Sequence, residues 1–312
     1  MKKAVKYIVE VPGSSGNFGC GFDVLAAALD VGNRFEFTVK PGDFALDIKI
    51  SGFGAGILPD NSSNAIWQSA LALWRKTGFN YKKIGSVSIK TLNRIPLMKG
   101  MGSSATARVA GALFANEVSG AGFDKSAVLE IVAAQEGHYD NAAASLLGGI
   151  VICDPSGGKA LTLSRGIKNP LCIAVPDIDV STDKARKILP KNYTREDVVF
   201  NLSRISALID GIYRGRVEPF MFDDRIHTPY RKKFIKGFDS VEKAALKNGA
   251  IGVFISGSGS SVGAIAKDAK CAGNLARAMK KAFASRGVKC EVIITSIAAL
   301  GAEIKKIRRL IK

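Results

Sequence analysis

The sequence predicts an α+β protein built as two lobes, and three observations point to this fold class. The chain has 312 residues, of which 47% are hydrophobic and 23% charged, enough for more than one packed core. Stretches of alternating polarity, typical of half-buried strands, are interspersed with helical stretches. The pattern breaks at residues 154–168, where Pro and Gly gather. We therefore expect domains at residues 1–160 and 161–312.

In the first half, β-branched and alternating residues predict strands, and longer apolar patterns predict helices. The strands are expected at 7–11, 34–40, 46–50 and 86–90. The helices are expected at 64–76, from 104 to about 118, at 125–135 and shortly after residue 141. Loops rich in Gly and Ser are expected at 13–21 and 99–104, and the second of these leads into an Ala-rich helix.

In the second half, short apolar runs predict strands at 150–153 and 171–176. Helices are expected at 182–188, 198–213, 229–248 and 271–285. The Gly-rich stretch 251–266 is expected to form two short strands around a turn at 256–259. A strand at 290–295 and a basic helical tail complete the chain.

The chain is strongly basic, with 45 Lys and Arg against 27 Asp and Glu, a net charge of +18. Such a charge can indicate nucleic-acid binding, and this alternative stays open. The basic residues are mostly scattered, however, and the short clusters at 231–233 and 305–309 have no interleaved aromatic residues. A solvated basic surface, or an anionic small substrate such as a nucleotide, fits this distribution better.

Cysteine usage and hydropathy indicate the cytoplasm. The five cysteines are widely spaced and form no Cys-x-x-Cys pair, which argues against a zinc site or a disulfide framework. No apolar run reaches the roughly 18 residues that a membrane helix needs. The N-terminus has no long apolar stretch and no small-residue cleavage site of the kind that marks a signal peptide. We therefore predict a cytoplasmic protein that does not contact a membrane.

The strongest local motif is the loop 96–106, Pro-Leu-Met-Lys-Gly-Met-Gly-Ser-Ser-Ala-Thr, which runs directly into a predicted helix. Glycines let a backbone turn several N–H groups toward one point, and the start of a helix leaves further N–H groups without partners. Such a loop can hold the phosphates of ATP. The alternative is an ordinary turn in which Ser103 caps the helix.

Three further segments carry polar groups that suit a ligand site. Residues 136–141, Glu-Gly-His-Tyr-Asp-Asn, place four polar side chains close together. The loop 11–23 has too little bulk for a core and could present Asn17 and Asp23. The Gly-rich segment 255–259 could bring its backbone close to a ligand or to another loop.

Together these segments resemble the homoserine kinases of the GHMP kinase superfamily, over nearly the whole chain. Residues 96–106 are similar to the ATP loop P-x-x-x-G-x-G-S-S-A, and 11–23 are similar to V-P-A-[ST]-[ST]-A-N-[LF]-G-x-G-F-D. Residues 136–141 resemble E-G-H-x-D-N, with L-G-G following at 147–149, and 255–259 resemble the third superfamily motif. The most discriminating segment is 224–231, which is similar to D-R-[LI]-H-x-P-Y-R.

The resemblance implies the fold and the reaction. The expected fold has an N-terminal ribosomal-protein-like β-α lobe and a C-terminal ferredoxin-like lobe. The expected reaction is ATP-dependent phosphorylation of the L-homoserine hydroxyl to O-phospho-L-homoserine, in threonine biosynthesis, with ATP and Mg²⁺ and with a homodimer as the common assembly. The nucleotide-binding residues would be Pro96, Lys99, Gly100, Met101, Gly102, Ser103, Ser104, Ala105 and Thr106. Ser104 and Glu130 would be the Mg²⁺ ligands.

The same resemblance assigns the acceptor site. Asp23, Thr182, Arg186 and Arg231 would bind the amino acid, with the two Arg on its carboxylate and Asp23 on its ammonium. Asn17, His138, Asp140 and Asn141 would hold the hydroxyl in line with the γ-phosphate. Phosphoryl transfer needs positioning more than a strong base, so Asp140 is expected to position first and to act as a base second.

The chain also departs from the family patterns, and other readings stay open. Gly13 and Gly16 replace Ala, and Cys20 replaces Pro, which predicts a more flexible loop, at a cost of about 1 kcal/mol per site. Ser260 and Ser261 stand where Pro-Thr is common. The alternatives are a sibling kinase for a shikimate-like or mevalonate-like alcohol, a nucleic-acid-binding protein, and a sensor that binds ATP without turnover.

Overall fold

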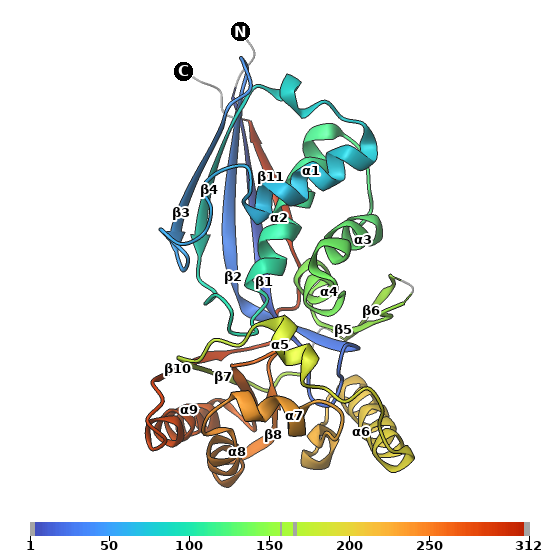
Figure 1. Cartoon of the computed structure of the whole chain (residues 1–312), viewed down its shortest axis with the longest axis vertical. Coiled ribbons are helices and arrows are strands. Elements are labelled where there is room, and N and C mark those ends of the chain that lie inside the picture. The colour runs from blue at the N-terminus through green and yellow to red at the C-terminus, as the bar shows by residue number, and fades with distance from the viewer. Residues whose placement is uncertain (1–3, 157, 165–166, 309–312) are drawn as a thin grey trace.

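The computed structural model describes residues 4–156, 158–164 and 167–308, and it confirms the predicted α+β fold class. Two lobes lie end to end along the long axis of the molecule, each with its own sheet (Figure 1). The outer ends of the predicted domains, residues 1–3 and 309–312, lie outside the described residues, as do three residues of the predicted boundary region, 157, 165 and 166.

The N-terminal lobe has a mixed sheet with helices on one face (Figure 1). Its main strand order is β11 (Glu303–Arg308), β1 (Val5–Gly16), β2 (Leu25–Lys40), β4 (Ser86–Asn93) and β3 (Leu46–Gly52). Strand β5 (Ile150–Cys153) pairs with β2, and β6 (Ala160–Ser164) pairs with β5. Only the β3–β4 pair is parallel among these described strands. The covering helices are α1 (Ala65–Thr77), α2 (Ser103–Ser119), α3 (Lys125–Glu136) and α4 (Asp140–Leu147).

The core of this lobe follows from alternation in the strands and small residues in α2. Phe35 and Phe37 of β2 are fully buried under the helices, and Phe37 stacks on Phe114 of α2. Where α1 and α2 cross, a Cβ added at Gly111 would lie 1.9 Å from the carbonyl oxygen of Ile66. The Ala-rich and Gly-containing face of α2 therefore allows the close helix packing that places its N-terminus at the lobe junction.

The C-terminal lobe has a four-stranded antiparallel sheet in the order β10 (Cys290–Thr295), β7 (Leu171–Pro176), β9 (Val262–Ala266) and β8 (Ala250–Ile255). Helices α8 (Phe238–Lys247) and α9 (Ala269–Ala284) pack on it. Counted along the lobe, the strand order is 4-1-3-2, the ferredoxin-like arrangement that the family resemblance predicts. Helices α5 (Thr182–Lys187), α6 (Arg195–Tyr213) and α7 (Thr228–Arg231) lie between β7 and α8, and short 3₁₀ turns cover Tyr81–Ile84, Pro219–Phe222 and Lys232–Phe234.

Three element predictions were wrong, each for a physical reason. The tail 303–308 is a strand because it pairs antiparallel with the edge of β1, where Ile304 lies opposite Val9. It therefore belongs to the N-terminal sheet, although the predicted second domain, 161–312, includes it. The predicted helix 229–248 is split, with Pro229 in the first turn of α7 and Gly237 at φ 95° before α8. Much of the predicted loop 13–21 is strand, because β1 continues to Gly16 against β2.

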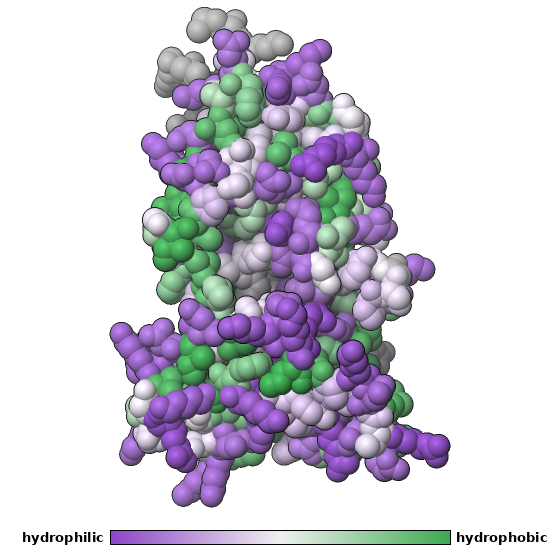
Figure 2. Space-filling model, in the orientation of Figure 1, coloured by the Kyte–Doolittle hydropathy of each residue, from purple (hydrophilic) through white to green (hydrophobic). Residues whose placement is uncertain are grey.

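Hydrophilic side chains are spread over both lobes on the face seen in Figure 2 rather than gathered in one band. Among the described residues, no helix combines the length and the apolar character that crossing a membrane requires.

Candidate active site

A cavity of about 280 Å³ lies where the two lobes meet, below the N-terminus of α2. Both lobes contribute to its wall, and most of the sequence-predicted site residues lie there. The residues that line it are Asn17, Pro96, Met98, Lys99, Gly100, Met101, Gly102, Ser103, Ser104, Glu136, His138, Asp140, Asn141, Val180, Ser181, Thr182, Arg186, Arg231 and Ser258. The structure therefore brings together residues that are up to 241 positions apart in the sequence, as the acceptor-site prediction requires.

The predicted nucleotide loop forms the upper wall of the cavity. Gly102, at φ 71°, precedes α2, and no side chain caps the first turn of this helix among the described residues. Ser103 is therefore the first helical residue and not the N-cap of the alternative interpretation. Uncapped N–H groups and the positive end of a 17-residue helix favour an anion here.

Ala105 and Thr106, which were predicted to bind the nucleotide, lie inside α2 and support the loop instead. Ala105 and Thr106 are fully buried within α2 and do not line the cavity. The Thr106 hydroxyl donates to the carbonyl of Ser103 and accepts from the amide of Asn33 (2.9 Å), whose Oδ1 accepts from the backbone N–H of Arg94 (2.8 Å). These bonds hold the start of α2 and the approach to the loop in one conformation.

The loop is fastened to the C-terminal lobe by hydrogen bonds at residues 256 and 257. The Ser256 hydroxyl donates to the carbonyl of Gly100 (2.7 Å) and contacts the hydroxyl of Ser15 (2.8 Å). The N–H of Gly257 donates to the carbonyl of Gly16 (2.8 Å). The Gly-rich segment 255–259 thus approaches both other glycine loops, as its sequence suggests.

We expect Gly100→Ala to destabilise the protein more than Gly120→Ala. Both glycines have left-handed backbone, at φ 70° and 64°, so each substitution costs about 1–2 kcal/mol for conformation. At Gly100 the new Cβ would lie 2.0 Å from the Ser256 carbonyl oxygen, whereas at Gly120 nothing lies within 4 Å. The clash adds about 1–3 kcal/mol. Urea unfolding of both variants measures the difference, and equal losses would contradict this account of the lobe junction.

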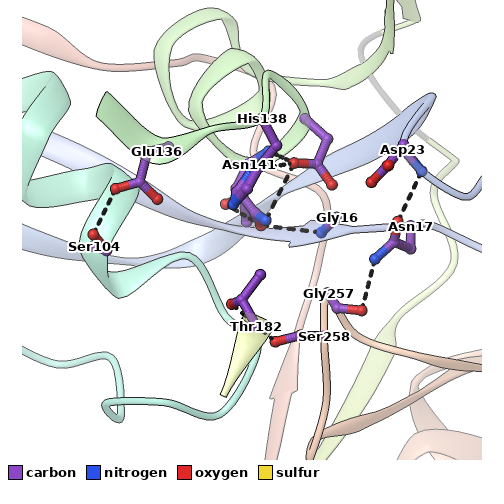
Figure 3. Close-up of polar contacts among 12 residues, drawn as sticks. Gly16, Asn17, Asp23, Ser104, Glu136, His138, Asn141, Thr182, Gly257 and Ser258 are labelled. Atoms are coloured by element: carbon purple, nitrogen blue, oxygen red, sulfur yellow. Dashed lines mark hydrogen bonds and ion pairs between the residues drawn. The ribbon is translucent and has the colours of Figure 1, made fainter. Parts of the chain in front are cut away.

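The Mg²⁺ prediction needs one correction. Glu130 does not line the cavity; its carboxylate is half exposed and lies 3.5 Å from the ammonium of Lys76. The carboxylate that lines the cavity is Glu136, at the end of α3, and it accepts a 2.6 Å hydrogen bond from the Ser104 hydroxyl (Figure 3). Arg108 of α2 also donates to Glu136. A serine and a carboxylate oxygen that converge in this way are hard oxygen donors of the kind that Mg²⁺ prefers.

Three of the predicted catalytic residues, His138, Asp140 and Asn141, contact one another at the start of α4, and the fourth, Asn17, directly follows β1. The amide oxygen of Asn141 accepts from the hydroxyl of Ser14 (3.0 Å) and the backbone N–H of Gly16 (3.1 Å), which joins α4 to β1 (Figure 3). Asn17 has left-handed backbone, and its amide donates to the Gly257 carbonyl (2.7 Å). A Cβ at Gly16 would lie 2.3 Å from Asp140 Oδ2. Gly16 therefore lies in a buried strand in close contact with Asp140, where the sequence predicted a flexible loop.

Asp140 and His138 form an ion pair, with Nδ1 of the ring 2.7 Å from Oδ1 of the carboxylate. Burial lowers the pKa of His138, but the adjacent Asp140 more than offsets this and holds that pKa above its usual range. Burial also raises the pKa of Asp140, but His138 and the Asn141 N–H outweigh burial and keep it below its usual range. Asp140 is therefore ionised and a weak base in this arrangement.

This ion pair predicts a pH dependence of stability. The His138 contribution is complete below about pH 6.5 and is lost as the pH rises through the raised folded-state pKa. The Asp140 contribution is present above about pH 3.8 and is lost as the pH falls through the lowered folded-state pKa. We expect His138→Gln to cost about 1–3 kcal/mol at pH 6, because the Asp140 carboxylate loses its charged partner. The loss should shrink by pH 9, as denaturant unfolding at several pH values would measure; a loss independent of pH would contradict the pairing.

Three of the predicted substrate-binding residues, Thr182, Arg186 and Arg231, line the cavity from the C-terminal lobe, and the fourth, Asp23, pairs with Arg186. Arg186 of α5 donates to both carboxylate oxygens of Asp23, each at 2.8 Å. Arg186 lines the cavity, but Asp23, at φ 56°, does not. The Thr182 hydroxyl, at the start of α5, lies 3.5 Å from the hydroxyl of Ser258 (Figure 3).

Arg231 is only 1% exposed and lines the cavity. Its Nε donates to the Ala185 carbonyl and its Nη1 to the Gly257 carbonyl, each at 3.1 Å, and the group lies 4.9 Å from the ring centre of Phe22. Burial lowers the pKa of Arg231 to about 10, so the cation is still charged at neutral pH. A desolvated cation with donors to spare is suited to bind a carboxylate.

Asp224 and His227 hold Arg231 in place, although the sequence interpretation did not assign them to the site. The Asp224 carboxylate accepts the N–H groups of Ile226 and His227 (each 3.0 Å) and that of Thr228 (2.6 Å), and so fixes the turn that begins α7. The fully buried His227 ring stacks on Phe22, and burial keeps its pKa below the usual range. Both residues belong to the segment 224–231, whose family resemblance was a signal that could have assigned them.

The chain is similar in sequence and in structure to known kinases. Residues 64–149 match the GHMP kinases N terminal domain, and residues 208–285 match the GHMP kinases C terminal domain. The chain is 34% identical to a homoserine kinase of Trichormus variabilis, over 94% of this chain and 97% of the relative. It is 33% identical to a homoserine kinase of Desulfitobacterium hafniense, over 95% and 99%.

Solved structures extend the comparison. The crystal structure of homoserine kinase from Cytophaga hutchinsonii superposes with a TM-score of 0.86 at 29% identity, covering 98% of both chains. A mevalonate kinase of L. major, at 14% identity and a TM-score of 0.67, shares the fold. The chain therefore belongs to the GHMP kinase superfamily and, within it, to the homoserine kinases.

Proposed function

We propose that this chain transfers the terminal phosphoryl group of ATP to the side-chain hydroxyl of L-homoserine, a step toward threonine. The observation that carries the proposal is the shared cavity: an uncapped helix N-terminus, suited to phosphate, faces two arginines and an ionised Asp140. The names and coverage of the relatives support this reaction over another alcohol or a nucleic acid as the ligand.

ATP would bind with its phosphates against the backbone of Gly100–Ser104, where the helix dipole and the N–H groups favour negative charge. Ser104 and Glu136 would hold Mg²⁺, because their oxygens converge at the edge of this loop. Bound there, the ion would neutralise charge that develops on the phosphoryl oxygens.

The amino acid would bind by replacing part of the Asp23–Arg186 pair. Homoserine carries one positive and one negative group, so its ammonium can take the Asp23 carboxylate while its carboxylate takes Arg186 and Arg231. Thr182 lies beside this position and would add a hydroxyl contact. An alcohol with a carboxylate and no amine would leave Asp23 unpaired, which is the physical basis for preferring an amino acid.

Asn17, His138, Asp140 and Asn141 would hold the hydroxyl against the γ-phosphorus. We propose that Asp140 acts mainly by positioning, since its carboxylate is occupied by His138 and the Asn141 N–H and its pKa is below the usual range. The new bond joins the homoserine oxygen to phosphorus while the bond from phosphorus to the ADP oxygen breaks, and the hydroxyl proton passes to an oxygen of the transferred phosphoryl group. A loose transition state for this transfer needs alignment more than a strong base.

A coupled ADP-release assay across homoserine, serine, threonine, shikimate and mevalonate tests the proposal. We expect ADP release to depend on homoserine and to be much slower with the other alcohols. Release with shikimate or mevalonate instead would support a sibling kinase, and binding of ATP without turnover would support a sensor. The homodimer and the cytoplasmic location stay predictions, which light scattering and cell fractionation would check.

A further inference from the structure

Lys99 belongs to the nucleotide loop, but its side chain reaches into the C-terminal lobe. Its ammonium donates to the carbonyl of Ile178 (3.0 Å) and to the carboxylate of Asp179 (2.7 Å), and Asp177 lies 4.0 Å away. The Lys99 side chain is only 12% exposed, so these acceptors replace most of its contact with water.

These acceptors lie in the linker between β7 and α5, residues 177–181, which leads directly to the amino-acid site. Ser181 caps α5 by accepting the N–H of Lys184, and the next residue, Thr182, lines the cavity with Arg186 of the same helix. The Ala185 carbonyl of α5 accepts from Arg231. A shift of the 177–181 linker would therefore change the positions of the groups proposed to bind homoserine.

A second contact holds the same junction. The Ser260 hydroxyl donates to the Ile178 carbonyl that also accepts from Lys99, and the N–H of Ser261 donates to the carbonyl of Lys99 (3.3 Å). The two serines are the residues that depart from the family pattern Pro-Thr. Because proline has no N–H and no hydroxyl, it could not make the Ser260 contact.

We propose that Lys99 is a positioning residue that couples nucleotide binding to homoserine binding, through Asp179 and the 177–181 linker. The proposal rests on the proposed function, and it replaces the expected role of Lys99 as a nucleotide-binding residue. A nucleotide that orders the loop 99–104 would thereby order α5, and homoserine bound to α5 would order the loop. Such coupling is reciprocal, so each ligand should raise the affinity for the other by the same factor.

Calorimetric titration of a non-hydrolysable ATP analogue with Mg²⁺, without and with saturating homoserine, measures this factor. We expect the wild-type protein to bind the analogue several times more tightly with homoserine present. Lys99→Met and Asp179→Asn should each lower the coupling factor about twofold to fivefold, the range that a partly exposed ion pair supplies. The double variant should lose no more than either single variant.

The matched control is Lys187→Met, which removes the exposed Lys187–Asp183 pair on the same helix and should leave the coupling factor unchanged. If Lys99 were instead a phosphate ligand, Lys99→Met would weaken binding of the analogue alone, whereas Asp179→Asn would keep full coupling. That result, or a wild-type protein with no coupling, overturns the proposal. The homoserine-dependent ADP release of the wild-type protein, measured in parallel, separates this failure from failure of the proposed reaction.

Discussion

Arg231→Ala is expected to raise the KM for homoserine about 10- to 100-fold while changing kcat much less. The buried guanidinium would supply charge-assisted hydrogen bonds to the substrate carboxylate, each worth about 1.5–3 kcal/mol. Such bonds form in the ground state and persist in the transition state, so their loss appears in KM. Steady-state kinetics with homoserine varied at saturating ATP measures the effect.

Two further variants make this result interpretable. Arg225→Ala removes a guanidinium six residues earlier, which stacks on Phe200 and does not line the cavity, and should leave the KM unchanged. Arg231→Lys keeps the charge but cannot reach the carbonyls of Ala185 and Gly257 together with the substrate, so it should restore only part of the affinity. A folded Arg231→Ala protein with an unchanged KM would show that the substrate assignment is wrong.

Glu136→Gln is expected to lower kcat about 10²- to 10³-fold, the usual effect of removing one group that stabilises the developing charge. The substitution keeps the shape of the side chain and can still accept from Ser104, but it removes the negative charge that a divalent cation requires. The Mg²⁺ concentration that gives half-maximal rate should rise as well. Both quantities come from rate measurements at several Mg²⁺ concentrations.

The control for this prediction is Glu130→Gln on the same helix, six residues earlier. Its carboxylate pairs with Lys76 at the surface and does not line the cavity, so kcat and the Mg²⁺ requirement should stay within about twofold of wild type. If Glu130→Gln had the larger effect, Glu130 would be the Mg²⁺ ligand, and the proposed pairing of Ser104 with Glu136 around the ion would be wrong.

Features of the site that depend on backbone chemistry could be predicted from the sequence. The loop 96–106 combines glycines with a helix start, a combination that is suited to bind an anion. Strands 34–40 and 86–90 could be predicted as well, since their polarity alternates and one face is buried. The strand at 13–16 could not, because Gly and Ser give no hydrophobic signal and are buried here by α4 and β2.

Features that depend on tertiary contacts were beyond sequence reasoning. Glu130 lies on the predicted helix 125–135 and Glu136 directly follows it, and only the packing of α3 against α2 places Glu136 beside Ser104. The pairing of Asp23 with Arg186, 163 residues apart, is likewise a product of the fold. The tail 303–308 has charges typical of an exposed helix, but the free edge of β1 provides backbone partners that only a strand can use.

The return of the last described strand to β1 limits how the molecule can open. The polypeptide enters the C-terminal lobe after β6 and comes back before β11, so that lobe is tethered at two points rather than one. An antiparallel bridge between Leu29 of β2 and Ile297 fixes the segment between β10 and β11 against the N-terminal sheet. Because two chain connections restrain the C-terminal lobe, we expect ADP and phosphorylated product to leave by a small change in the angle between the lobes, which keeps both connections intact.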